Sequence, residues 1–167
     1  AVYRPGRDGQ MTLLRKPEFR EPTTYFPGVA GMSGTAADYF RFCQMLLSGG
    51  TLDGTRVIGS RTLAFMTANH LPGGADLSQF ATGGFSESSY EGVGFGLGFA
   101  TKLDAVRNGF PCSTGSFFWG GLASTLFWVD PQEDLVVVFL TQLIPSSTFN
   151  FRGQLESIVY AALDPSQ

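Results

Sequence analysis

The sequence predicts an α+β fold, in which a helical region precedes antiparallel strands and a final helix lies on one face of the sheet. Three observations support this prediction. Residues 35–48 carry a helical apolar repeat, strand-like apolar runs follow between residues 92 and 141, and a second helical stripe covers residues 151–163. The 167 residues suit one domain with a sizeable core.

The first part, residues 1–91, is predicted to contain loops and helices. A short hairpin is expected between residues 2–4 and 11–14. The first firm helix runs from Thr35 to Ser48, with Thr35 as N-cap and Asp38 completing an approximate capping box. Its expected apolar face consists of Ala36, Phe40, Cys43 and Leu47.

Glycines at 49 and 50 are expected to end this helix in the left-handed conformation. A second helix is predicted from Ser60, as N-cap, to about Asn69. The stretch 71–91, rich in Gly, Ser and Ala, is predicted to be a long loop. Loops of this length in compact domains are commonly binding loops, lids or disordered segments.

The second part, residues 92–142, is predicted to be three antiparallel strands. Residues 92–100 alternate glycine with large apolar residues, a period of two that indicates a strand. Two further strands are expected at 116–129 and 135–141, and Asp130 and Pro131 favour a turn between them. The run at 135–140 lacks alternation, as in a strand covered on both faces.

The third part, residues 149–164, is predicted to form a helix from about Phe151 to Leu163 that packs on the sheet. Its expected apolar stripe consists of Phe151, Leu155, Ile158, Val159 and Ala162.

Composition excludes several classes of protein. The net charge is −3 without a Lys/Arg cluster, which argues against a nucleic-acid partner. No apolar run reaches the ~18 residues of a membrane span. Two cysteines and one histidine, without a Cys/His cluster, give no reason to expect a metal or another cofactor.

Isolated candidates for chemistry have simpler structural explanations. His70 is the only histidine available for a Ser-His-Asp triad, but it lies at a predicted helix end, where solvent exposure is the simpler interpretation. Glu87 is interpreted as a solvated loop residue. Asp130, Glu133 and Asp134 form an acidic cluster that is better explained as a turn. Cys43 is expected to be a small buried hydrophobe.

Several linked motifs carry a resemblance to a known family. Residues 31–50 read GMSGTAADYFRFCQMLLSGG and are followed by LDGTRVI at 52–58. Further along, GFGLGF at 94–99, WGG at 119–121 and FWVDP at 127–131 occur in the family's order. Over roughly residues 3–163 the chain resembles serine β-lactamase-related hydrolases. It is similar to class C β-lactamases and more closely to family VIII carboxylesterases.

This resemblance implies a β-lactamase/transpeptidase-like fold and hydrolysis through an acyl-enzyme. The family uses an S-x-x-K nucleophile and base, a Y-x-N or Y-x-S segment and a K-T-G-type strand. Only the third element has a counterpart here, at Trp119-Gly120-Gly121. We therefore expect a C-terminal portion of such an enzyme, with the N-terminal part of the fold missing and the isolated chain inactive.

The same resemblance assigns the candidate site. The backbone N–H of Leu122 maps to the oxyanion hole, and Gly120 and Gly121 would let the acyl group approach the backbone. Trp119 replaces the usual Lys, which favours neutral esters over β-lactam-like substrates that carry a carboxylate. Without the resemblance, a core or edge aromatic would explain Trp119 equally well. The Gly120–Gly121 pair itself suggests a bulge or a close approach.

The expected partners are a small ester or β-lactam-like substrate and the N-terminal part of the same enzyme. Without that part, the chain is expected to expose a sheet edge and apolar surface. The alternative is a binding or interaction module that retains the fold without chemistry, with the 71–91 loop and the Trp119 groove holding a ligand.

Overall fold

A computed structural model describes residues 1–16, 24, 32–80 and 89–163. Its main elements, in chain order, are β1 (Val2–Pro5), β2 (Met11–Arg15), α1 (Ala36–Leu47), β3 (Thr51–Leu52), β4 (Thr55–Arg56), α2 (Ser60–Thr67), β5 (Val93–Phe95), β6 (Ala100–Lys102), α3 (Ala105–Asn108), β7 (Phe117–Gly120), β8 (Leu126–Asp130), β9 (Leu135–Phe139) and α4 (Phe151–Ala161). Short 3₁₀ turns cover Pro72–Gly74, Leu77–Gln79 and Ser146–Thr148. None of the described helices combines the length and apolarity needed to cross a bilayer.

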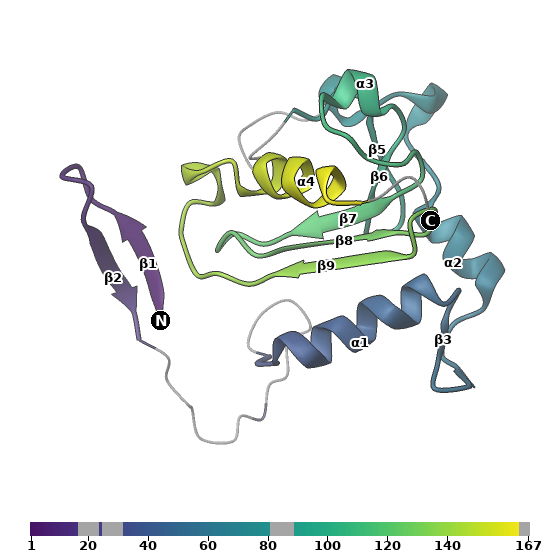
Figure 1. The fold of residues 1–167 in the computed structure, drawn as a ribbon, viewed down its shortest axis with the longest axis horizontal. Coiled ribbons are helices and arrows are strands. Elements are labelled where there is room, and N and C mark those ends of the chain that lie inside the picture. Colours follow the sequence, from purple (N-terminus) through teal and green to yellow (C-terminus); the bar gives the residue numbers. More distant parts are fainter. Residues whose placement is uncertain (17–23, 25–31, 81–88, 164–167) are drawn as a thin grey trace.

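The centre of the fold is a five-stranded antiparallel sheet in the order β5-β6-β7-β8-β9, with helices on both faces (Figure 1). α4 covers one face and α1 the other, which gives three layers. Alternate residues of the strands therefore contribute to two cores. Phe117 and Val129 join the core on the α1 side, whereas Phe118 and Trp128 join the core on the α4 side. The predicted α+β architecture is confirmed.

The predicted three-strand sheet is wrong in strand number, because two predicted strands are hairpins. Residues 92–100 reverse between β5 and β6, where Gly98 has φ +97° and the Gly96 N–H donates to the Phe99 carbonyl at 2.8 Å. Residues 116–129 reverse between β7 and β8, where the Gly121 N–H donates to the Thr125 carbonyl at 2.8 Å. The Gly120–Gly121 pair thus marks a strand end and a turn.

The helix predictions are correct in position but wrong in part about the buried faces. The Thr35–Asp38 capping box of α1 is present, and Gly49 and Gly50 both have positive φ. However, the buried residues of α1 are Cys43, Met45 and Leu46, and Phe40 is exposed. Tyr39, in the first turns of α1, is also exposed and borders a groove described below. α2 ends at Thr67, and its N-cap is Gly59 rather than Ser60.

Polar residues occupy the buried face of α4. Phe151, Leu155 and Val159 pack on the sheet as predicted, whereas Ile158 is exposed. The buried residues of this helix are Arg152, Gly153 and Glu156. Glu156 forms an ion pair of 3.0 Å with Lys102 of β6, and each of the two side chains is only 2% exposed.

The turn and edge predictions have different outcomes. Asp130 caps the β8–β9 turn by accepting N–H groups of Gln132 and Glu133, which confirms the structural interpretation of that acidic cluster. β9 is only half-buried, because it is an edge strand, whereas β6 and β8 are buried along their whole length. The β1–β2 hairpin forms as predicted.

Candidate functional site

A groove of about 610 Å³ lies where the open end of β7 meets the start of α1. Its walls come from three segments far apart in the sequence: the approach to α1, the β7–β8 hairpin and the residues after β9. They are Met32, Ser33, Gly34, Thr35, Asp38, Tyr39, Trp119, Gly120, Gly121, Thr125, Leu126, Phe127, Leu140 and Gln142. The structure thus brings Trp119, Gly120 and Gly121 together in one concave site.

Trp119 forms an aromatic wall of this groove. It lies opposite Phe127 across the β7–β8 pair, and its ring meets that of Phe95 edge to face, with centroids 5.0 Å apart and planes at 75°. The side chain is 38% exposed, so the indole is fixed by Phe95 while part of its surface stays open. Such a surface suits an apolar or aromatic ligand group.

Close packing on the protein side leaves little room for a side chain at the two glycines. A Cβ at Gly120 would lie 2.7 Å from Nη2 of Arg152 and 3.1 Å from the Thr125 carbonyl, and a Cβ at Gly121 would collide with the Thr125 hydroxyl. A larger residue at either position would therefore have to displace its neighbours even without a ligand. This packing fixes the backbone that lines the groove.

Leu122 follows in the turn and is not among the groove-lining residues. Its side chain is 59% exposed. The turn around it is fixed by two hydrogen bonds: Gly121 N–H to the Thr125 carbonyl at 2.8 Å and Ser124 N–H to the Gly121 carbonyl at 3.0 Å. Within the described part of the chain, the Leu122 N–H donates no hydrogen bond. It is therefore a donor available at the end of the strand.

The polar side of the groove is built by the α1 N-terminus. Thr35 and Asp38 bond reciprocally, since each backbone N–H donates to the other's side chain at 3.0–3.1 Å. These bonds from Thr35 hold the pKa of the Asp38 carboxyl below its usual value, so this lining residue carries a negative charge. Beside it, desolvation raises the pKa of Tyr39, whose ring meets Phe127 edge to face at 5.3 Å.

A complete nucleophile–base pair is not formed by the described residues. Lys102 donates to Asn108 and Glu156 in the α4-side core, and no described Ser hydroxyl bonds to a lysine. His70 lies just after α2, with Nε2 2.6 Å from the Phe65 carbonyl, and its ring bonds to no Ser or acid among the residues that the structure describes. No described cluster of three His, Cys, Asp or Glu could hold a metal ion.

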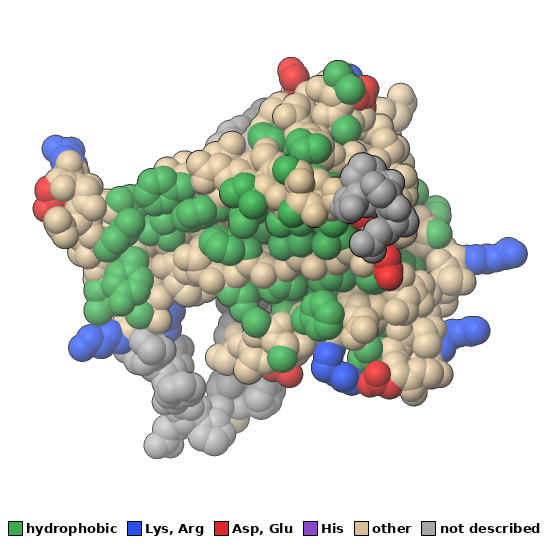
Figure 2. Space-filling model, viewed as in Figure 1, with side chains coloured by type: hydrophobic (Ala, Val, Ile, Leu, Met, Phe, Trp, Pro, Cys, Tyr) green, Lys and Arg blue, Asp and Glu red, His purple; other side chains and the backbone are tan. Residues whose placement is uncertain are grey.

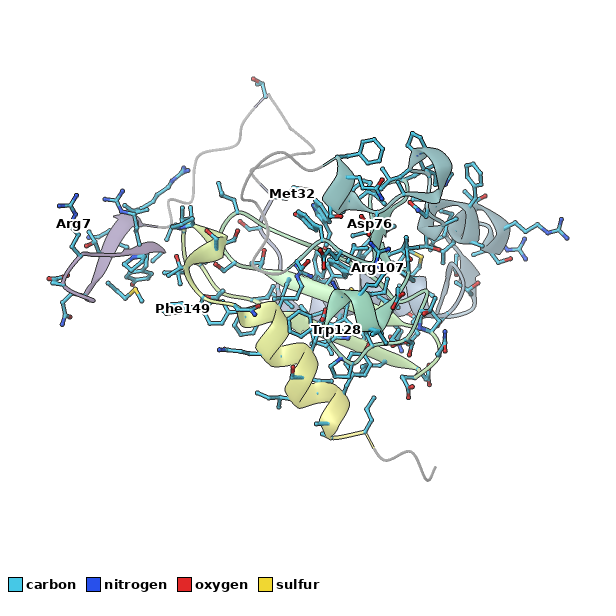
Figure 3. All side chains as sticks on the ribbon, turned by 90° about the horizontal axis from the view of Figure 1, so that it is seen from above. Arg7, Met32, Asp76, Arg107, Trp128 and Phe149 are labelled. Carbon is cyan, nitrogen blue, oxygen red and sulfur yellow. The ribbon has the colours of Figure 1, made fainter. Side chains whose placement is uncertain are left out.

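Sequence reasoning assigned no site role to the residues before and at the start of α1. Met32, Ser33 and Tyr39 line the groove, although their segment entered the prediction only as part of the resemblance. The capping box predicted where the helix begins, but not that this end faces β7. The predicted loop at 71–91 is described in part. The Asp76 carboxylate accepts from the Gly92 N–H and from Arg107, and Figure 3 shows Asp76 and Arg107 side by side. Glu87 lies outside the described residues.

Comparisons with known proteins define the class. The sequence model of the family described as Beta-lactamase matches residues 2–156. Protein Rv1367c of Mycobacterium tuberculosis (strain ATCC 25618 / H37Rv) is 32% identical over 127 residues, which are 74% of this chain and 31% of that protein. The chain therefore spans about a third of this relative's length. "Uncharacterized protein MT1414" of M. tuberculosis (strain CDC 1551 / Oshkosh) matches with the same identity, 32%, and the same coverage.

Solved structures agree on the fold. EstCE1, described as a hydrolase with promiscuous acyltransferase activity, superposes with a TM-score of 0.72 at 24% identity, over 95% of this chain and 42% of EstCE1. Simvastatin synthase (LovD) from Aspergillus terreus gives a TM-score of 0.70 at 18% identity, over 98% and 42%. The site thus lies in a fold of the β-lactamase/transpeptidase type. The chain belongs to the β-lactamase family.

Proposed function

We propose that this chain forms the oxyanion-hole wall of a serine hydrolase that cleaves carboxylic esters through an acyl-enzyme. The observation that carries the proposal is the arrangement around Trp119-Gly120-Gly121: the triplet lines an apolar groove, and the next residue, Leu122, has an N–H that no described group accepts. Family membership and the fold shared with a hydrolase support this choice.

The reaction needs a hydroxyl nucleophile, which the S-x-x-K element of the same enzyme would supply from outside these residues. That hydroxyl attacks the ester carbonyl and loses its proton to a Lys or Tyr base, and the alcohol then leaves. Water attacks the resulting acyl-enzyme and releases the acid. The Leu122 N–H would stabilise the negative charge on the carbonyl oxygen in both steps, an effect of about 3–4 kcal/mol for one such donor.

The groove favours neutral substrates. Its aromatic and aliphatic lining includes Trp119, where the family's usual Lys would attract a carboxylate. Asp38 is the only charged side chain among the described lining residues, and it is negative. An anionic ligand would meet this charge without a compensating cation in the groove. A Trp119→Lys variant is expected to gain activity on carboxylate-bearing esters relative to neutral ones.

We propose that the partner of this chain is the N-terminal part of the same enzyme, and two surfaces support this. The outer edge of β9 makes no hydrogen bond with a described residue, whereas the β5 edge receives the His70 N–H at the Phe95 carbonyl. An unpaired edge is a template for a further strand. In the β1–β2 hairpin, Tyr3 pairs with Leu13 and Pro5 with Met11, so one face is apolar. Tyr3, Met11 and Leu13 are exposed, and apolar side chains are visible on the surface of the hairpin (Figure 2).

The hairpin extends away from the sheet, with Arg7 at its far end (Figure 3). It contacts the body through Tyr3, whose N–H donates to the Gln142 carbonyl at 2.8 Å. Size-exclusion chromatography should show a soluble complex when this chain is combined with the part that bears S-x-x-K. A well-behaved monomer of this chain alone would argue against the proposal.

The decisive test of function uses a fluorophosphonate serine probe followed by intact-mass spectrometry. An adduct on the N-terminal part, formed when the two parts are combined, is the expected result. An adduct on this chain alone would place the nucleophile within it and overturn the division of roles. No adduct on the complete native polypeptide would support the alternative, a ligand-binding module without chemistry.

The role of Leu122 can be tested separately in the active protein. Leu122→Pro removes the N–H and is expected to lower kcat about 10²–10³-fold, whereas Leu122→Ala keeps the N–H and serves as the matched control. Similar kcat values for the two variants would exclude Leu122 as the oxyanion donor.

A further inference from the structure

The guanidinium of Arg152 lies directly behind the glycine that lines the groove. Arg152 belongs to the first turn of α4, on the opposite side of the sheet from α1. Its Nη2 is 2.7 Å from the point where a Cβ of Gly120 would lie, and its Cζ is 4.5 Å from the centre of the Phe118 ring. Phe118 and Gly120 are two residues apart on β7, so they share one face of the strand. The arginine therefore extends along this face as far as the strand end.

The position of this arginine is not explained by helix stability. The first turn of a helix carries a partial positive charge, so an acidic residue there is stabilising and a cation is unfavourable. The first turn of α4 contains no acidic residue, yet it contains Arg152, of which only 8% is exposed. The helix dipole therefore does not account for this arginine.

Neighbouring contacts hold the helix start, and thus the arginine, in place. The Asn150 side chain caps α4 by accepting the Gly153 N–H at 2.9 Å. Gly153 has no side chain because the Phe110 ring occupies that space, with ring atoms 2.5 Å from where its Cβ would lie. On the same side of the sheet, Lys102 Nζ lies 5.0 Å from the Phe118 ring, so this ring contacts two cations.

We propose that Arg152 is a positioning residue for the strand end that lines the groove. This role rests on the proposed function. The planar guanidinium fills the space beside Gly120 and the Thr125 carbonyl, which accepts the Gly121 N–H, and so fixes the turn that presents Leu122.

The packing gives a structural reason for glycine at position 120 that is independent of substrate approach. Any side chain at position 120 would displace the guanidinium rather than project into open space. Arg152 and Gly120 form a complementary pair across two elements that are 32 positions apart in the sequence. Lys cannot replace this contact fully, because its ammonium lacks the flat shape and the fork of N–H donors.

The test compares Arg152→Met and Arg152→Lys with Leu155→Ala, which loosens the packing of α4 away from Gly120. Hydrogen exchange of the 117–125 segment is measured by mass spectrometry in the complete protein. We expect Arg152→Met to accelerate exchange of the Gly121 amide about tenfold more than Leu155→Ala does at equal loss of Tm, with Arg152→Lys intermediate. Equal acceleration in Arg152→Met and Leu155→Ala would mean that Arg152 only helps α4 to pack on the sheet, and would overturn the proposal.

The second readout is kinetic. In the active enzyme, Arg152→Met should lower kcat about 10–100-fold while KM for a neutral ester changes little, because misplaced donors act on the transition state. A change in KM alone would contradict a role at the oxyanion. The exchange measurement does not depend on catalysis. If the protein shows no hydrolase activity, the proposed function fails, and the exchange data still decide whether Arg152 positions the strand.

Discussion

Replacing Lys102 by Met is expected to be the most destabilising single change in the α4-side core. Lys102 Nζ lies 3.0 Å from Glu156 Oε2, and both side chains are 2% exposed. It also donates to Asn108 Oδ1 and lies over the Phe118 ring. Methionine fills a similar volume but leaves the Glu156 carboxylate buried without its cation. Removing one partner of a buried ion pair costs about 3–5 kcal/mol.

The measurement is urea unfolding followed by circular dichroism at neutral pH, and the structure supplies a matched control. Arg41 and Asp53 form a shorter ion pair, 2.7 Å, but their side chains are 55% and 70% exposed. Arg41→Met should therefore cost no more than about 1 kcal/mol. The double variant Lys102→Met/Glu156→Leu should recover most of the loss, since no buried charge of the pair remains.

Two outcomes would refute this reasoning. If Lys102→Met were as mild as Arg41→Met, the Lys102–Glu156 pair would have to be solvated in solution. If the double variant were as unstable as Lys102→Met alone, the loss would come from packing or from the Asn108 bond and not from an unpaired carboxylate. Asn108 matters in either case, because its Nδ2 donates to the Ser89 and Glu91 carbonyls and so fixes the chain before β5.

Three further changes have definite expected outcomes. Gly50→Ala should destabilise the protein by more than about 2 kcal/mol in thermal unfolding, because Gly50 has φ +96° and its Cβ would collide with the Ile58 carbonyl. Gly49→Ala, in open space at φ +68°, should cost only about 1–2 kcal/mol. Equal losses of stability in the two variants would contradict this. Thr35→Ala should cost about 1 kcal/mol through loss of the capping box, and Thr35→Ser should restore it. Burial raises the pKa of Cys43 from 9.0 to about 12, so between these pH values the folded state holds a proton that the unfolded state releases. The free energy of unfolding should therefore fall as pH rises from 9 towards 12, and it should fall less steeply in Cys43→Ala.

Much of the fold was predictable because it depends on local signals. The capping box of α1, its two-glycine end and the Asp130 turn each need only a few adjacent residues, and each forms where the sequence predicts it. The number of strands was predicted wrongly because the alternation of apolar residues and glycines continues through a turn when glycine occupies the positions where the chain reverses. Leu97 fits the alternation perfectly, yet it is 49% exposed in the turn between β5 and β6.

The candidate site was predictable on one side only. The resemblance identified Trp119-Gly120-Gly121, but the opposite wall depends on how the start of α1 meets the end of β7, a contact between residues more than 80 positions apart. Periodicity carries no information about such contacts. Similarly, Arg152 and Glu156 lie outside the apolar stripe predicted for the last helix, because their burial depends on Gly120 and Lys102, which lie on distant strands.

The register of the β7–β8 hairpin connects these two sides of the site. Phe117 and Trp119 face the α1 side and the groove, whereas Phe118 and Gly120 face α4 and Arg152. Because side chains alternate, a shift of one residue would exchange the two sets and direct Trp119 towards the buried arginine. The pairing of Gly120 with Leu126 and the bond from Gly121 to Thr125 prevent this shift. The turn that contains Leu122 therefore also determines which face of β7 lines the groove.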